Sequence, residues 1–314
     1  MSDIADGQLA AVRVACVHAR STSSEKIALF RSLFRGRQDI YPRRFENTKT
    51  GRKGYAPACA NEWVRGICEK PRIKCGDCPH RAFLPVTDEV IRCHLSGRDP
   101  AGKDFVAGVY PMLADETCYF LAIDFDKELW QQDVLAVMET CRHLQIPAAL
   151  ERSRSGNGGH VWLFFTEAIP ATLARKLGSL ILTATMERRP ELGLNSYDRF
   201  FPNQGTLPRG GFGNLIALPM QKASRENGNS LFVDDAFTPH QIRGLFYHPS
   251  PACPASGSNP LRKMRKTAVA SWVCASPYLL IVNLSHGILR HPVRIANHLS
   301  WIRCGRKSKW CWPI

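Results

Sequence analysis

Residues 119–127 read Tyr-Phe-Leu-Ala-Ile-Asp-Phe-Asp-Lys. This apolar, β-branched and aromatic composition is typical of a strand that is buried on both faces of a sheet. Side chains two positions apart leave a strand on the same face, about 7 Å apart along the chain. We therefore expect Asp124 and Asp126 to project together, and Ile123 and Phe125 to point to the opposite face.

A divalent cation would explain why two carboxylates share one face. Two such groups repel each other, and burying them unpaired is costly. Hard cations such as Mg²⁺ prefer oxygen ligands, and a bound cation removes both costs. The alternative is a pair that faces solvent at the end of a strand. The apolar run before Asp124 and Asp126 favours the metal site.

Length and composition describe a soluble globular protein. The chain has 314 residues, of which 44% are hydrophobic and 22% are charged, which suits one large domain with an appendage, or two domains. Residues 1–10 lack the basic and apolar regions of a signal peptide. Residues 266–290 are uncharged between their ends, but Pro277, Asn283 and His286 make them a poor membrane span. We expect a cytoplasmic protein, encoded by a prokaryote or a mobile element, without a membrane partner.

The net charge of +15 is unevenly distributed. The last acidic residue is Asp235, and residues 236–314 contain 11 Lys and Arg. Residues 1–235 carry 31 basic and 27 acidic residues, a net charge of only +4. A strongly basic domain would indicate nucleic-acid binding, but here most of the excess belongs to the C-terminal segment.

Four cysteines follow the spacing C-x8-C-x6-C-x2-C at Cys59, Cys68, Cys75 and Cys78. Zn²⁺ takes four such ligands tetrahedrally in closed structural sites, and the Cys75–Cys78 knuckle places two thiolates on one ion. Without a secretory signal, a metal site is favoured over disulfides. An iron–sulfur cluster is the second interpretation. His80, Cys93 and His94 are alternative ligands.

A glycine-rich loop precedes a second apolar strand over 160–165. Glycines let a backbone approach a ligand closely and turn N–H groups onto phosphate oxygens. His160, at the start of the strand, could donate to an anionic phosphate. The alternatives are an ordinary hairpin turn and a structural histidine. The loop and its histidine read Arg154, Ser155, Gly156, Asn157, Gly158, Gly159 and His160.

Periodicity and stop signals predict the other elements. Helices are expected over 23–37, 88–95, 129–144 and 171–189, and strands over 41–46, 105–113, 147–151 and 214–219. A third carboxylate, Asp198, follows the apolar and aromatic residues Leu194 and Tyr197. Taken alone, it would be read as a cap or turn residue.

The order of these features resembles the archaeo-eukaryotic primase superfamily, the primase-polymerases. Their three motifs are hydrophobic-Asp-x-Asp, small-x-His and hydrophobic-Asp, here Asp124-x-Asp126, the loop ending in His160, and Asp198. The cysteine segment, with Cys59-Ala-Asn-Glu-Trp63 and Cys68-Glu-Lys-Pro71, is similar to the primase domain of TOTE conflict systems. So are residues 213–222 and 228–235. The resemblance covers roughly residues 24–240.

The resemblance implies an α+β fold: an RRM-like catalytic core with a central mixed sheet, and an N-terminal zinc-binding module. Asp124, Asp126 and Asp198 would hold two Mg²⁺ or Mn²⁺ ions, the ions that two-metal phosphoryl transfer requires. His160 and the loop 154–159 would bind the triphosphate of an NTP or dNTP. Arg209 and Lys222 would contact phosphate or template, while Asn214 stands where some relatives have an arginine.

The expected divisions are an N-terminal tail 1–22, a region 23–110 with the structural zinc site, a catalytic core 111–245, and a basic segment 246–314. The last segment is either a truncated or frame-altered remnant or a nucleic-acid-binding extension. The predicted function is a DNA primase and polymerase that acts on single-stranded or primer-template DNA, or RNA, with helicase or nuclease modules in trans. The alternatives are an inert nucleic-acid-binding protein and a template-independent nucleotidyltransferase.

Overall fold

The structure is a computed structural model, and it describes residues 17, 21–48, 50–239, 302–303 and 310–311. The chain divides into two units, Met1–Leu280 and Ile281–Ile314. In the second unit, β10 (Ile302–Arg303) pairs with β11 (Trp310–Cys311) in antiparallel fashion. The prediction for residues 246–314 otherwise lies outside the described residues.

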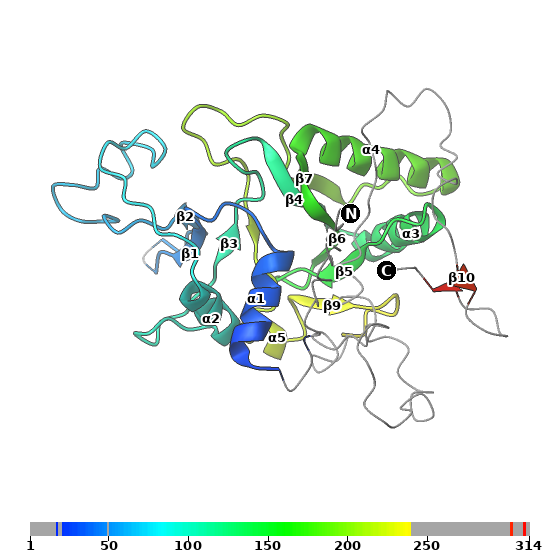
Figure 1. The fold of residues 1–314 in the computed structure, drawn as a ribbon, viewed down its shortest axis with the longest axis horizontal. Helices are drawn as coiled ribbons and strands as arrows, with labels where there is room; N and C mark the ends of the chain where they lie inside the picture. Colours follow the sequence, from blue (N-terminus) through cyan, green and yellow to red (C-terminus); the bar gives the residue numbers. More distant parts are fainter. Residues whose placement is uncertain (1–16, 18–20, 49, 240–301, 304–309, 312–314) are drawn as a thin grey trace, which may run out of the picture. The chain divides into compact units, whose positions relative to one another are not determined.

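A five-stranded sheet forms the centre of the first unit (Figure 1). The strand order is β7-β4-β6-β5-β9. The strands are β4 (Thr117–Asp126), β5 (Ala149–Arg152), β6 (Gly158–Pro170), β7 (Tyr197–Phe201) and β9 (Leu231–Val233). The stretch 119–127 thus supplies most of β4, which lies between β7 and β6, as its apolar composition predicts.

The predicted mixed sheet is wrong, because every neighbouring pair in this sheet is antiparallel. Helix α3 (Trp130–His143) connects β4 to β5, and α4 (Ala171–Arg188) connects β6 to β7. The two strands that each helix connects therefore run in the same direction, but they are not neighbours, because one antiparallel strand lies between them. This β-α-β-β-α-β order is that of split βαβ folds, and it agrees with the predicted RRM-like core.

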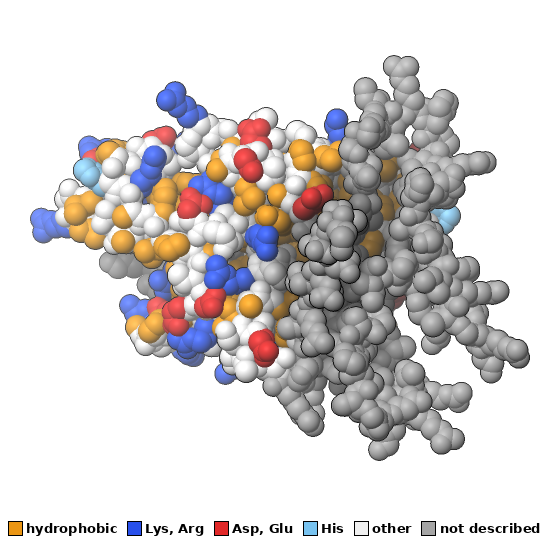
Figure 2. Space-filling model, in the orientation of Figure 1, with side chains coloured by type: hydrophobic (Ala, Val, Ile, Leu, Met, Phe, Trp, Pro, Cys, Tyr) orange, Lys and Arg blue, Asp and Glu red, His pale blue; other side chains and the backbone are white. Residues whose placement is uncertain are grey.

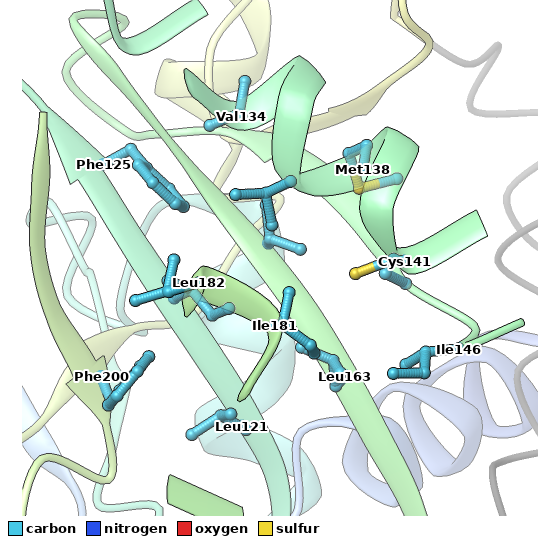
Figure 3. Packing of buried hydrophobic residues seen from close by; sticks show 14 of the residues in the cluster. Leu121, Phe125, Val134, Met138, Cys141, Ile146, Leu163, Ile181, Leu182 and Phe200 are labelled. Atoms are coloured by element: carbon cyan, nitrogen blue, oxygen red, sulfur yellow. The ribbon is translucent and has the colours of Figure 1, made fainter. Parts of the chain in front are cut away.

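Helices α3 and α4 cover one face of the sheet (Figure 1). Odd-numbered residues of β4 and β6, among them Leu121, Phe125 and Leu163, pack against Val134, Met138 and Ile181 of these helices (Figure 3). Burying each such side chain contributes about 1.5–3 kcal/mol. Alternation along β4 then sends Asp124 and Asp126 to the other face.

Even-numbered residues of β4 and β6, together with Phe201 of β7 and Phe232 of β9, pack against the N-terminal region on that other face. Helix α1 (Ser23–Leu33) begins with a capping box between Thr22 and Glu25. Phe34, just after the helix, meets Trp162 edge-on with ring centroids 5.2 Å apart, and Trp162 stacks on Phe164 at 5.8 Å. Residues 23–110 and the sheet therefore share one aromatic core.

The remaining elements surround this core. They are β1 (Pro42–Glu46), β2 (Lys53–Pro57), α2 (Asp88–Ser96), β3 (Gly108–Val109), β8 (Ile216–Ala217) and α5 (Lys222–Glu226). β1 pairs with β2, and β3 pairs with β8, both antiparallel. The strands predicted over 105–113 and 214–219 shrink to two residues each, because only that short stretch of each finds a partner. No helix among the described residues has the length and apolarity to cross a membrane.

Candidate active site

The carboxyl end of β4 carries the two aspartates on the face opposite α3 and α4. Asp124 pairs in register with His160 of β6, and Asp126 pairs with Gly158. Both carboxylate side chains are half-buried. The predicted shared face is confirmed, and the missing side chain at Gly158 leaves Asp126 without a neighbour across the strand pair.

His160 lies between two carboxylates. Its Nε2 is 3.4 Å from Asp124 Oδ1, and its Nδ1 is 2.9 Å from Glu151 Oε2. Burial alone would lower the pKa of His160, but the charges and hydrogen bonds of Glu151 and Asp124 outweigh burial and raise it. A cationic imidazole at this position is a suitable partner for a phosphate oxygen.

A bulge in β7 brings the third aspartate to this face. Phe125 pairs with Tyr197 and Asp124 pairs with Arg199, so Asp198 is the extra residue between them. A bulge bends its strand and re-aims side chains. The Arg199 guanidinium donates to Asp198 Oδ2 at 2.5 Å. This hydrogen bond and the charges of Asp198, Asp124 and Asp126 raise the pKa of Arg199, which places it in the field of all three carboxylates.

The glycine-rich segment forms the hairpin turn between β5 and β6. Gly156 has φ +82°, a conformation that favours glycine. A Cβ on Gly158 would lie 2.4 Å from the Phe125 carbonyl oxygen, and one on Gly159 would lie 2.7 Å from the Trp130 ring. Close packing beside β4 and α3 thus accounts for these two glycines, while Ser155 and Asn157 lie exposed at the tip of the turn.

Two of the loop amides already have partners inside the turn. Gly156 N–H donates to the Ser153 carbonyl at 3.0 Å, and Asn157 N–H donates to Ser155 Oγ at 3.3 Å. These amides would have to exchange their bonds before they could bind phosphate. Burial raises the pKa of Tyr55 in β2, and the nearby charge of Arg154 opposes part of this rise. The turn therefore lies near the β1–β2 hairpin.

Among the described residues, Arg209 and Lys222 make no contact with the three aspartates that the structure records. Arg209 is exposed and adjoins Gly210, whose carbonyl oxygen would be 2.5 Å from a Cβ on Gly76 of the cysteine segment. Lys222 is also exposed, and its Nζ is 3.8 Å from Glu226 within α5. Neither contact leads to β4.

The four predicted cysteine ligands line one pocket, together with His80. All four are free thiols and half-buried. Cys59 Sγ accepts a hydrogen bond from the Ala82 N–H at 3.3 Å. Burial raises the pKa of the Cys75 thiol, and the adjacent Lys70 ammonium opposes this shift.

The alternative ligands Cys93 and His94 lie elsewhere, in α2. Cys93 donates to Glu89, and His94 is fully buried between Ala107 and Pro219. They are excluded from the cysteine pocket because helix α2 turns both side chains toward the protein core.

A family model describing the archaeo-eukaryotic primase domain of TOTE conflict systems matches residues 25–244. The chain belongs to this family. The match covers the cysteine segment, the whole five-stranded sheet, α2 to α5 and all but the first two residues of α1. A comparison with curated proteins found no match.

The two carboxylates at the end of β4 of this primase domain are oxygen donors of the kind that a divalent cation prefers. Asp126 Oδ1 is buried and has no hydrogen-bond partner, and its ion pair with Lys127 Nζ is long, at 3.9 Å. No group of three or more His, Cys, Asp or Glu side chains among the described residues is arranged to hold a metal ion. Beside Asp198, the Arg199 guanidinium supplies the positive charge that a metal ion would otherwise supply. An ion would therefore bind Asp198 through Oδ1 or displace Arg199 from Oδ2.

Two residues of the primase domain's site escaped the sequence reasoning. Glu151 was predicted only as part of a strand, and Arg199 was not considered. An acidic residue at the end of an apolar strand is a signal for Glu151, since its position opposite His160 follows from the hairpin. No local signal marks Arg199, because its orientation depends on the bulge.

Proposed function

We propose that this domain is a primase-polymerase that joins nucleotides on a single-stranded nucleic-acid template with the help of Mg²⁺ or Mn²⁺. One observation carries the proposal. Asp124 and Asp126 share a face of β4, with His160 3.4 Å from Asp124 and the Asp198 bulge directly across the strand pair. Family membership supports a primase-like nucleotidyltransferase of a conflict system.

Asp124, Asp126 and Asp198 would hold the divalent ions, with the unsatisfied Asp126 oxygen as one ligand. When bound, such ions neutralise the charge that develops during phosphoryl transfer and align the attacking and leaving oxygens. The carboxylates also orient Arg199, which becomes free to contact a phosphate once Asp198 binds metal. The protein's contribution is therefore positioning and charge rather than covalent chemistry.

The β5–β6 turn would bind the triphosphate. His160 is half-buried beside Asp124 and donates a hydrogen bond from a fixed position. Ser155 and Asn157 at the exposed tip can reach the outer phosphates, and Arg154 adds positive charge.

A structural zinc ion would complete the cysteine segment. Cys59, Cys68, Cys75 and Cys78 supply four sulfur ligands, the number that closed tetrahedral sites use. The Ala82 N–H bond to Cys59 and the Lys70 ammonium beside Cys75 both stabilise thiolates. Zinc would tie together a segment that has few apolar side chains of its own.

The cysteine segment would also contact the template strand, DNA or RNA. Trp63 is 69% exposed, with the Lys70 Nζ 5.7 Å from its ring centroid. In Figure 2, hydrophobic side chains gather at the left end of the molecule, with Lys and Arg side chains beside them. Single strands bind to exposed aromatic rings flanked by cations. Arg209, on the adjoining loop, would add a phosphate contact, and helicase or nuclease modules would act in trans.

Nucleotide incorporation on single-stranded DNA tests the proposal, with and without a primer and in Mg²⁺ or Mn²⁺. Asp124→Asn should abolish products. Asp104→Asn is the control and should not, because Asp104 is exposed and its carboxylate pairs only loosely with Arg98, at 3.8 Å. Unprimed products would establish a primase. A folded wild type without products would refute the proposal and favour an inert nucleic-acid-binding protein.

A further inference from the structure

Glu151 is a buried carboxylate next to the proposed nucleotide site. It is 2% exposed and pairs in register with His160 across β5 and β6. Burying an ionised carboxylate is costly unless it is paired and hydrogen-bonded. Glu151 Oε2 lies 2.9 Å from His160 Nδ1 and 2.8 Å from Trp162 Nε1, so one oxygen serves two side chains.

The donors and acceptors of this arrangement are determined by Trp162. An indole Nε1–H can only donate, and an ionised carboxylate can only accept. Oε2 therefore accepts from Trp162, and Nδ1 of His160 must carry a proton in order to donate to the same oxygen. The imidazole then presents Nε2 toward Asp124, at 3.4 Å from Oδ1.

Trp162 holds the carboxylate in place. It is fully buried, stacks on Phe164 and meets Phe34 edge-on. Side chains fixed by such packing have little freedom to rotate. Glu151 is therefore held by the aromatic core, and its bond to Nδ1 in turn limits rotation of the His160 ring at the edge of the site.

We propose that Glu151 is the positioning residue that orients His160 toward the triphosphate of the incoming nucleotide. This inference rests on the proposed function. Glu151 does not touch the nucleotide itself. It fixes the ring orientation by accepting from Nδ1–H, so that Nε2–H of the cationic ring can donate to a phosphate oxygen. For metal-bound histidines, loss of the group that orients the ring typically costs about 10–100-fold in metal affinity or activity, and we expect a loss of the same order here.

The experiment compares Trp162→Phe with the double variant Glu151→Met/Trp162→Phe. Trp162→Phe keeps the hydrogen bond between His160 Nδ1 and Glu151. It also serves as the reference, because neither variant then contains an indole N–H that has lost its acceptor. Binding of dGTP in Mg²⁺ without template is measured by calorimetry. Thermal melting serves to check that both variants fold. ¹⁵N NMR of histidine-labelled protein identifies which ring nitrogen of His160 carries a proton. Glu151→Gln serves as a conservative variant, because its amide oxygen can still accept both bonds.

The double variant should bind dGTP about 10–100-fold more weakly than Trp162→Phe, while Glu151→Gln stays within a few-fold of wild type. The NMR spectrum should show a hydrogen-bonded Nδ1–H in Trp162→Phe and its loss in the double variant. Equal dGTP affinities, or an unchanged His160 spectrum, would overturn the inference. A wild type that binds no dGTP but shows the Glu151-dependent Nδ1–H would refute the nucleotide site of the proposed function, and with it the role toward a triphosphate, while the orientation of His160 by Glu151 would stand.

Discussion

His94 makes the stability of the fold depend on pH. The ring is fully buried: Nδ1 accepts from the Ala107 N–H at 3.1 Å, and Nε2 donates to the Pro219 carbonyl at 2.9 Å. Both bonds require the neutral ring with its proton on Nε2. Protonation of Nδ1 would break the bond to Ala107 and bury a charge. Burial thus lowers the pKa of His94 from 6.5 to about 4.

The sign and size of the effect follow from this pKa. Between pH 6.5 and 4 the unfolded chain binds a proton at His94 and the folded protein does not, so acid favours unfolding. The stability that neutral His94 contributes is fully present above pH 6.5 and falls as the pH drops toward 4. A difference of roughly 2.5 pKa units corresponds to about 3 kcal/mol of unfolding free energy. His160, whose pKa is raised, adds a slope of opposite sign only near pH 6.5 and above, and this contribution is the same in the wild type and in a variant of His94.

Urea unfolding at several pH values between 7 and 4 measures the effect. His94→Gln can keep an acceptor and a donor but does not titrate, so the wild type should lose about 3 kcal/mol more than this variant over the window. Carboxylates that titrate near pH 4 affect both proteins equally. His143→Gln, at an exposed position of α3, is the control and should follow the wild type. Parallel curves for wild type and His94→Gln would refute the reasoning.

Three further predictions concern the turn, the cysteine segment and the template surface. Gly158→Ala places a Cβ 2.4 Å from the Phe125 carbonyl oxygen and should lower the unfolding free energy by about 1–3 kcal/mol; an unchanged urea midpoint would contradict this. The purified wild type should contain one zinc ion per chain by elemental analysis, and Cys75→Ser should lose it; a metal-free, folded wild type would argue against the site. Trp63→Ala should weaken binding of an oligo-dT strand by about 1–3 kcal/mol in fluorescence anisotropy without changing dGTP affinity, and equal oligo-dT affinities would exclude stacking on this ring.

Local patterns were sufficient for the core of the primase domain. Strand periodicity placed Asp124 and Asp126 on one face, because alternation depends only on the strand itself. The helices over 129–144 and 171–189 appear within one residue at each end as α3 and α4. The apolar residues of 160–165 also form the predicted strand, although β6 extends to Pro170.

Features that depend on pairing between distant strands were not accessible in the same way. The sheet is antiparallel because β6 lies between β4 and β5, an arrangement that no single segment encodes. The bulge that places Asp198 and Arg199 beside Asp124 arises from the register of β7 against β4. The glycines of the turn were interpreted as a phosphate cradle, whereas packing against Phe125 and Trp130 also requires two of them.

The most direct test of the account is the dependence of nucleotide choice on the template base. Wild-type protein is given four primed templates that differ only in the first unpaired base, with all four dNTPs and Mg²⁺ or Mn²⁺. The account predicts that the complementary nucleotide dominates on each template and that Asp124→Asn adds none. The same nucleotide on all four templates would contradict it and indicate a template-independent nucleotidyltransferase.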